Sequence, residues 1–477
     1  MKRVLAVLLF CVMPVLLLAH PKQNRQPRPL MFTHVTVIDA TGAPANSDMT
    51  VMIFGDRITE LGKTREVRLP KDAQVVDATG KFLIPGLWDM HVHWYLKNYL
   101  PLFIANGVTG VRIMWGLQLH NQWRKEIETG TLLGPRFVIA SSIVDGPNPV
   151  WPGSVSVSNE AEARQAVIKA KRDGADFIKV YSRLSREAFL AIADETKKQG
   201  LPFAGHVPQS VTPAQASDAG QKSIEHLTGI LTACSSREEE LAKRREDAAA
   251  NLASGQRTPS PANSRSLTRL MLETFNAEKA ADLFARLKRN QTWQCPTLTV
   301  LRSTASLDDP NLGSDPRLKY MPPSMRTQWD PTKDFRFKQR TAEDFELARL
   351  VYKRQVEVVG AMRRAGVEFL AGTDALNPYC FPGFSLHDEL VLLVNAGLTP
   401  MEALQAATLN PARFLGKEKE LGTVEKGKVA DLVLLEANPL KDIRNTQKIN
   451  AVTIRGKLIP KSELEQMLAT VEAANRK

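Results

Sequence analysis

Cysteine is scarce in this sequence, with four residues among 477. Cys11 lies in an apolar stretch directly after the bulky Phe10, which is not the setting of a lipid-modified cysteine. The other three, Cys234, Cys295 and Cys380, are far apart. Such spacing excludes a disulfide framework and a zinc ribbon, although one pair could form a bond in an oxidising compartment. At least one cysteine would then stay unpaired within the chain.

A hydrophobic run of full transmembrane length is also missing from the N-terminal region. A transmembrane helix needs about 20 apolar residues, whereas this apolar run extends only from Val4 to Leu18. It follows Lys2 and Arg3, an order typical of a signal peptide, which we place at residues 1–19. An uncleaved anchor is the alternative. We expect a periplasmic or secreted protein without a stable membrane anchor after cleavage.

Basic residues are in excess but are not gathered together. The chain has 63 Lys and Arg against 51 Asp and Glu, a formal net charge of +12. A clustered excess would suit nucleic acid or an anionic surface. Here the run from Lys243 to Arg245 lies beside Glu238 to Glu240, which indicates a solvated face of mixed charge. We expect a small-molecule or peptide-like substrate and no nucleic acid, and a homo-oligomer stays open.

Short β-rich runs are present near both ends of the chain. "FTHVTVIDA" and "MTVMIFGDRITELG" are broken by the turn signals "GAP" and "GDR". "GTVEKGKVADLVLLEANP" and "INAVTIRGKLI" repeat this style towards the other end. We expect one small β-sandwich assembled from residues 30–80 and 418–465.

Residues 81–417, between these ends, alternate apolar strand-length runs with polar, helix-periodic stretches. Eight strands are expected, at "FLIPGLWDMHVH", "VTGVRIM", "PRFVIASS", "DFIKVYS", "PFAGHV", "KSIEHL", "TWQCPTL" and "EFLAGTD". Their number predicts an α/β protein with a closed (β/α)8 barrel of the TIM type. The Pro-, Asp- and Ser-rich segment 303–337 is either a loop over the barrel mouth or a surface insertion.

Histidines fall at the ends of these expected strands. His91 and His93 are two residues apart, so the alternation of a strand points both to one face. An HxH pair alone is weak evidence for a zinc-type site, because core packing explains most such pairs. However, His206 and His226 also end strands, as does Asp374, where barrels keep their active sites. Independent placement would seldom produce this in a chain with eight histidines.

Lys179 is the unexpected member of this set. It lies within "DFIKVYS", on the same face as Phe177 and Tyr181. A bare ammonium beside two dications would be repelled and costly to desolvate. If its amine reacts with carbon dioxide, the carbamate has two oxygens that can bridge two metal ions. The alternative is a lysine that pairs with Asp374 or with a substrate carboxylate.

The ordered motifs "DMHVH", "GADFIKVYS", "AGHV", "IEHL" and "AGTD", followed by "LHDELVLLVNAGLTPMEALQAATLNPARFLG", resemble one branch of the amidohydrolase superfamily. That branch is imidazolonepropionase-like and prolidase-like, the latter meaning similar to Xaa-Pro dipeptidases, and the resemblance extends from about Phe32 to Lys457. It implies two divalent metal ions, zinc by default. One ion would be held by His91, His93 and Asp374, the second by His206 and His226, with Lys179 as a bridging N6-carboxylysine. The sequence departs from the family pattern at "GVRIM", so no role is assigned to Arg112.

Hydrolysis by a metal-bridging hydroxide follows from such a site. Asp374 would take the proton of the attacking water and pass it to the leaving group. The Tyr181 hydroxyl could bind the substrate by donating to the carbonyl oxygen, although a plain core or rim tyrosine is the alternative.

The expected bond is an amide C–N bond in an Xaa-Pro type dipeptide or an N-acyl amino acid. A cyclic amide, a lactone or another ester would react with the same hydroxide, so these stay open. Arg136, Arg183 and Arg186 near strand ends could bind a free carboxylate, or they are surface arginines. A non-catalytic periplasmic binding protein would be recognised by a lost ligand, and none is missing.

Overall fold

The computed structural model describes residues 28–253 and 261–476. The expected signal peptide, residues 1–19, lies outside these described residues. Within the described ranges, no helix has the length and apolar character that crossing a membrane requires.

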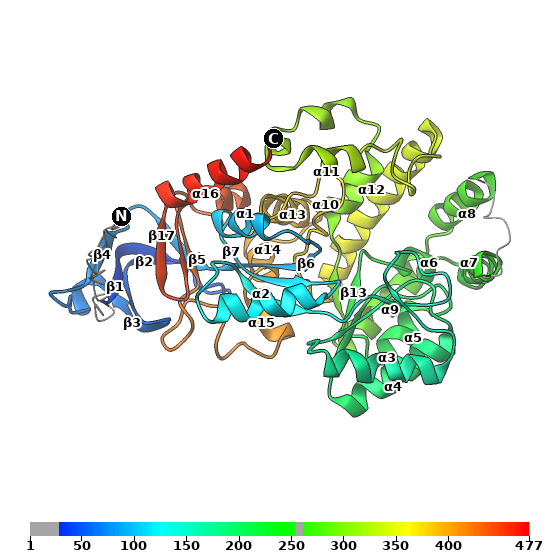
Figure 1. Cartoon of the computed structure of the whole chain (residues 1–477), viewed down its shortest axis with the longest axis horizontal. Coiled ribbons are helices and arrows are strands. Elements are labelled where there is room, and N and C mark those ends of the chain that lie inside the picture. Colours follow the sequence, from blue (N-terminus) through cyan, green and yellow to red (C-terminus); the bar gives the residue numbers. More distant parts are fainter. Residues whose placement is uncertain (1–27, 254–260, 477) are drawn as a thin grey trace, which may run out of the picture.

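One sheet of eight strands joins the two ends of the chain (Figure 1). Its order is β17-β16-β15-β5-β1-β2-β3, and β4 also pairs with β1. The strands are β1 (Leu30–Val37), β2 (Asn46–Phe54), β3 (Arg57–Lys63), β4 (Gln74–Asp77), β5 (Phe82–Pro85), β15 (Leu432–Leu435), β16 (Ile449–Ile454) and β17 (Lys457–Pro460). β5 connects the two halves, because it runs parallel to β1 and antiparallel to β15. Buried side chains from both chain ends, such as Phe32 and Leu432, share one apolar cluster. The β-rich ends therefore form a common sheet.

The run "FLIPGLWDMHVH", expected as one strand, is divided at Gly86. β5 ends just before this glycine, and β6 (Leu87–Val92) begins just after it as a member of a different sheet. A Cβ atom at Gly86 would lie 2.2 Å from Thr109 Oγ1, and the Gly86 N–H donates to the Asp431 carbonyl at 2.7 Å. Glycine is therefore required where the chain passes between the two sheets.

The middle of the chain is a mixed α/β unit with parallel strands. A three-stranded sheet has the order β6-β7-β8, and a six-stranded sheet has the order β10-β9-β11-β12-β13-β14. The further strands are β7 (Val108–Ile113), β8 (Arg136–Ile139), β9 (Val144–Asp145), β10 (Val155–Ser156), β11 (Ile178–Val180), β12 (Phe203–Gly205), β13 (Ser223–Glu225) and β14 (Trp293–Cys295). Isolated parallel bridges continue the pairing at Ala140–Phe177, Gln294–Phe369 and Val92–Ala375. The eighth expected run, "EFLAGTD", takes part through the bridge at Phe369, and the residue directly after the run, Ala375, makes another of these bridges.

Helices follow most of the parallel strands and begin with ordinary caps. Asn159 accepts from the Glu162 N–H at the start of α3, and Ser185 accepts from the Ala188 N–H at the start of α4. The α-helices are α1 (Leu100–Ala105), α2 (Gln118–Glu128), α3 (Glu160–Arg172), α4 (Arg186–Gln199), α5 (Pro213–Asp218), α6 (Ile230–Ala233), α7 (Glu238–Ala253), α8 (Pro261–Glu273), α9 (Ala277–Arg289), α10 (Leu298–Ala305), α11 (Pro323–Gln328), α12 (Ala342–Ala365), α13 (Phe384–Asn395), α14 (Pro400–Ala406), α15 (Leu409–Phe414) and α16 (Lys461–Ala474). The 3-10 helices are η1 (Thr64–Glu66), η2 (Lys97–Tyr99), η3 (Pro310–Ser314), η4 (Pro316–Tyr320) and η5 (Ile443–Gln447). α7 and α8 lie at the end of the molecule opposite the eight-stranded sheet, and α16 packs on α1 (Figure 1).

The segment 303–337, whose role the sequence left open, is folded and docked. It contains η3, η4 and α11. Trp329 is its anchor, since its side chain is buried and its Nε1 donates to the Leu376 carbonyl at 3.2 Å. The Trp329 ring also contacts the rings of Tyr379 and Phe381. The segment is thereby fixed to the loop that follows Asp374.

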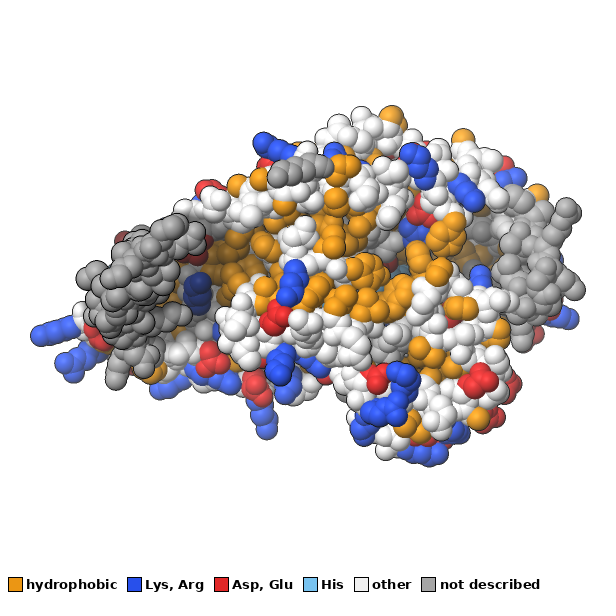
Figure 2. Space-filling model, in the orientation of Figure 1, with side chains coloured by type: hydrophobic (Ala, Val, Ile, Leu, Met, Phe, Trp, Pro, Cys, Tyr) orange, Lys and Arg blue, Asp and Glu red, His pale blue; other side chains and the backbone are white. Residues whose placement is uncertain are grey.

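Charged side chains of both signs are interspersed on the face drawn in Figure 2, with hydrophobic side chains along its middle. Cys234, Cys295 and Cys380 are all free and buried.

Candidate active site

A cavity of about 590 Å³ lies where the parallel strands end. Its lining includes side chains of two kinds. The potential ligands are His93, Lys179, His206, His226 and Asp374. The aromatic residues are Tyr95, Trp115, Trp151, Tyr181, Trp329 and Phe335. His91 is fully buried beside these ligands, so the structure brings together all six residues that the sequence predicted as metal ligands.

Asp374 lies between two groups of histidines. Its Oδ1 is 3.4 Å from His91 Nε2 and 3.1 Å from His93 Nε2. Its Oδ2 faces the other way, 3.8 Å from His226 Nε2. The His206 and His226 rings are neighbours, with centroids 4.9 Å apart. In the described part of the chain, His91, His93 and Asp374 form one of two groups of His, Cys, Asp or Glu close enough to hold a metal ion.

Three of the histidines are oriented through their Nδ1 atoms. The partners are Glu225 Oε2 at 2.7 Å for His91, Ser182 Oγ at 2.9 Å for His206, and Thr297 Oγ1 at 2.6 Å for His226. In metal-binding histidines, the ring nitrogen that does not bind the metal usually makes such a hydrogen bond, because this bond fixes the tautomer and the ring orientation. In each of them, Nε2 is the nitrogen left for a ligand.

The protonation states also suit a metal ion. Burial and the nearby Lys179 hold the pKa of His91 and of His206 well below the ordinary value, and burial lowers the pKa of His226 to about 4. Burial alone would raise the pKa of Asp374, but His226 and His93 outweigh it and hold this pKa below its usual range. Neutral imidazoles beside a carboxylate are donors that zinc-type ions accept, so these residues fit a metal centre.

Lys179 is buried, and burial lowers the pKa of its amine to about 8, against the opposing charges of Glu225 and Asp374. Among the described residues, no ion pair is formed by its Nζ, so the alternative of a pair with Asp374 is not what the structure contains. The neutral amine is the form that reacts with carbon dioxide, and the lowered pKa makes it accessible near neutral pH.

A buried ion pair supports the His91 ring. The sequence left one member, Arg112, without a role and did not single out the other, Glu225. Arg112 and Glu225 are both fully buried, with Nη2 2.8 Å from Oε1. Arg112 also donates to the Met90 carbonyl and to Ser223 Oγ. Glu225 thus connects the guanidinium to the imidazole of His91 and holds that ring in place.

Tyr181 lies at the cavity wall. Its ring stacks on His206 with centroids 4.0 Å apart, and its hydroxyl oxygen accepts a hydrogen bond from Trp151 Nε1 at 2.8 Å. Burial raises the pKa of Tyr181 well above the ordinary value. The hydroxyl therefore keeps its proton and can donate it in a hydrogen bond.

The backbone at the strand ends has unusual torsion angles. The φ values are 58° at His226, 50° at Thr297 and 59° at Asp374, in the left-handed region. Such residues cost free energy and are concentrated at functional sites. These angles turn the side chains of His226 and Asp374 towards the cavity.

The three arginines considered for a substrate carboxylate do not line this cavity. Arg136 pairs instead with Asp431 at 2.6 Å and borders a second cavity, at the opposite ends of the strands. Arg183 donates to the Asn148 carbonyl, and Arg186 is the first residue of α4.

Comparison with known proteins identifies relatives in sequence. A model described as "Amidohydrolase family" matches residues 337–459. The chain is 24% identical over 436 residues to the ochratoxinase of Aspergillus niger, which covers 78% of this chain and 73% of that protein. A shorter match, 35% identical over 97 residues, covers 19% of this chain and 21% of the imidazolonepropionase of Shouchella clausii.

Solved structures share the fold over nearly the whole chain. Bottromycin amidohydrolase has a TM-score of 0.73 at 22% identity, covering 94% of this chain and 91% of that one. An Xaa-Pro dipeptidase with bound methionine in its active site has a TM-score of 0.63 at 21% identity, covering 91% of this chain and 100% of that one.

Proposed function

We propose that this chain, a hydrolase of the amidohydrolase superfamily, cleaves an amide C–N bond with the help of two divalent metal ions. The observation that carries the proposal is the position of Asp374, whose two oxygens face different histidines. One ion would be held by His91, His93 and Asp374, and the other by His206 and His226. Carbamylated Lys179 would bridge them.

The proposal includes a closed (β/α)8 barrel. Its support is the chain of parallel bridges that leads from β8 to β11, from β14 to Phe369, and from Ala375 back to β6. We also propose export of the protein to the periplasm or medium, on the basis of residues 1–19, and a substrate that is a small molecule or peptide-like.

The residues of this chain would divide the chemistry between them. Ions of the zinc type, when bound by these residues, would supply an activated water and a positive charge near the scissile carbonyl. Asp374, ionised at neutral pH, accepts the proton of the attacking water and delivers it to the leaving nitrogen. The Tyr181 oxygen already accepts from Trp151, so its own O–H can donate to the carbonyl oxygen as negative charge develops there.

An amide bond is favoured over an ester or a lactone by the relatives whose names state an amidohydrolase or a dipeptidase. Whether the substrate is an Xaa-Pro dipeptide or an N-acyl amino acid depends on the cavity. A cyclic amide, lactone or other ester is the second candidate, because the same water attacks it.

The test is elemental analysis of the purified protein, followed by hydrolysis of a panel of dipeptides, N-acyl amino acids and lactones. We expect about two zinc-type ions per chain and turnover of an amide. Asp374→Asn is the matched inactive control, expected to keep the fold and to lose orders of magnitude in turnover. A protein that stays inert after supplementation with zinc and bicarbonate would contradict the proposal.

A further inference from the structure

Two aromatic side chains that line the cavity are largely exposed to solvent. Phe335 is 56% exposed and Tyr95 is 44% exposed, and both line the cavity. Large apolar groups that stay open to water beside a pocket mark surfaces that bind a ligand. Neither residue takes part in the hydrolysis proposed above.

Trp151 connects this aromatic surface to the reacting centre. Its ring meets Phe335 edge to face, with centroids 5.5 Å apart, and the Arg336 guanidinium lies 5.2 Å from its centroid. On its other side, Trp151 Nε1 donates to the Tyr181 hydroxyl. A group resting against Trp151 and Phe335 is therefore close to the carbonyl that Tyr181 would contact.

Trp151, Phe335 and Arg336 together are called the aromatic wall below. The charged groups on and beside this wall already pair with other groups of the protein. Arg336 donates through Nε and Nη2 to Asp334, at 3.0 and 2.6 Å, and through Nη1 to Asn377 Oδ1 at 2.7 Å. Lys333 pairs with Asp330 at 3.6 Å. An anionic group of the substrate would have to compete with these carboxylates, whereas a flat uncharged group can lie against the Trp151 and Phe335 rings without disturbing them. The guanidinium itself is already engaged, because it lies over the Trp151 and Phe337 rings, 5.2 and 4.8 Å from their centroids.

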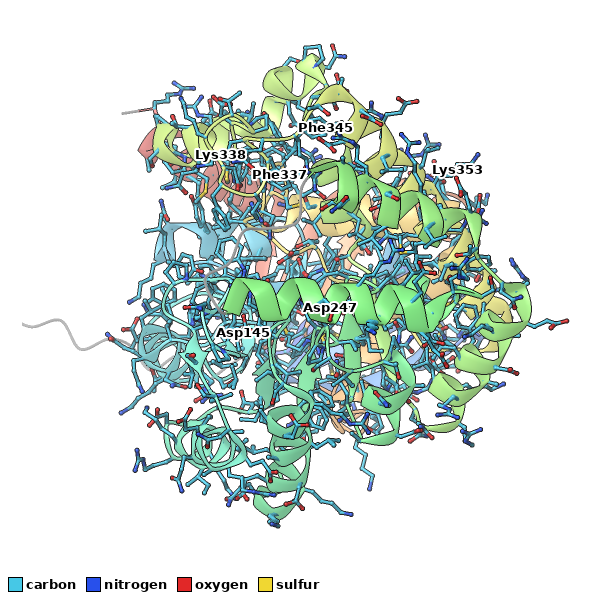
Figure 3. The ribbon with its side chains drawn as sticks, turned by 90° about the vertical axis from the view of Figure 1, so that its right-hand side faces the viewer. Asp145, Asp247, Phe337, Lys338, Phe345 and Lys353 are labelled. Carbon is cyan, nitrogen blue, oxygen red and sulfur yellow. The ribbon has the colours of Figure 1, made fainter. Side chains whose placement is uncertain are left out.

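Two buried groups hold the wall in position. The Asp145 carboxylate accepts from the N–H groups of Gly146, Val150 and Arg183, at 3.0, 3.0 and 2.6 Å. It thereby ties the loop that carries Trp151 to the loop that follows Tyr181. In Figure 3, Asp145 is labelled below Phe337, beside the helix α7 that carries Asp247.

The other side of the wall is fixed through Phe337, the neighbour of Arg336. Phe337 packs in a small apolar cluster with Leu307 and Phe345 (Figure 3). The surface is thus formed before any substrate arrives, which lowers the entropy that binding must overcome.

We propose that Trp151 and Phe335 form a subsite for an uncharged aromatic ring of the substrate, next to the scissile amide bond. This deepens the proposed function and rests on it. The substrate class is then an aryl-bearing amide such as an N-aroyl amino acid, or an amide of an aromatic amino acid.

The test compares three substrates of equal charge: N-benzoylalanine, N-acetylphenylalanine and N-acetylalanine. We expect the wild-type protein to have a higher kcat/KM for at least one ring-bearing substrate than for N-acetylalanine. Phe335→Ala should reduce this ratio by about 3- to 10-fold, the usual contribution of an aromatic contact. Phe335→Tyr, which keeps the ring, should preserve it. Phe54→Ala is the matched control, because Phe54 is 47% exposed on β2 in the other sheet, and it should leave the ratio unchanged.

A binding measurement separates this inference from the proposed function. N-benzoylalanine is titrated into Asp374→Asn protein while tryptophan fluorescence is followed, with and without Phe335→Ala. Weaker binding after Phe335→Ala supports the subsite even if no amide is turned over. Hydrolysis without any preference for a ring, or equal effects of Phe335→Ala on all three substrates, would overturn the subsite and leave the hydrolase intact.

Discussion

Glu225→Gln is expected to weaken metal binding without any direct contact between residue 225 and the ions. In the structure, Glu225 holds His91 Nδ1 at 2.7 Å and pairs with Arg112 at 2.8 Å, with all three side chains buried. The substitution removes the negative charge that orients the imidazole and leaves the Arg112 guanidinium without a counter-ion. Loss of such a supporting partner typically lowers metal affinity by about 10- to 100-fold.

The same change should lower the free energy of unfolding by about 3–5 kcal/mol, because it leaves one buried charge unpaired. The double variant Arg112→Met with Glu225→Leu separates the two effects. Replacing both members of a buried pair by apolar groups is often neutral for stability, whereas His91 still lacks its partner. We therefore expect the double variant to regain stability and to keep the weakened metal affinity.

Metal affinity is measured by competition with a chromophoric chelator, and stability by urea unfolding of the metal-free protein. Arg124→Met is the control, because the pair of Arg124 with Asp176 has the same 2.8 Å distance but is partly exposed. Its loss should cost less than about 1 kcal/mol. Wild-type metal affinity in the folded double variant would refute the positioning role of Glu225.

Three further outcomes are expected at Lys179 and Tyr181. Lys179→Ala should abolish activity and lower metal content, with partial rescue by short carboxylic acids that imitate the carbamate, and full activity would exclude a bridging role. In metal-free protein, uptake of ¹³C-labelled bicarbonate should rise with pH through about 8, because the amine reacts when neutral and its pKa is lowered to about 8. About one amine in ten is then already neutral at pH 7, and an NMR midpoint near 10.5 would contradict this. Tyr181→Phe should reduce turnover by about 10²-fold with the fold intact, and unchanged turnover and substrate binding would remove Tyr181 from the reaction.

Local sequence patterns were sufficient to predict most of the strands. The alternation of apolar, strand-length runs with polar, helix-periodic stretches correctly indicated strands of the parallel sheets at seven of the eight expected positions. The exception is "EFLAGTD", where Asp374 has a positive φ and the chain makes only isolated bridges. The two-residue spacing of His91 and His93 correctly predicted that their Nε2 atoms converge, here 3.3 Å apart.

Glu225 was not predicted, because the alternation rule gives the wrong side for it. A strand would send neighbouring side chains to opposite faces, so an inward His226 implies an outward Glu225. In the structure, the positive φ of His226 ends the alternation, and both residues face the interior. The pair is completed by Arg112, which is separated from Glu225 by 113 positions in the sequence. A local sequence pattern cannot indicate a partner at that distance. The aromatic wall is equally non-local, since Trp151 and Phe335 come from separate loops.

The central position of β5 has a consequence for how the chain is made. One edge of β5 pairs with β1 early in synthesis, but the other pairs with β15, where Pro85 lies opposite Leu432. At ordinary elongation rates, the roughly 350 intervening residues take about 20–70 s to emerge from the ribosome. Throughout that time β5 has an open edge, the kind of surface on which nascent chains aggregate. A holding chaperone would therefore raise the yield of folded protein most strongly if it bound residues 82–85 before β15 appeared.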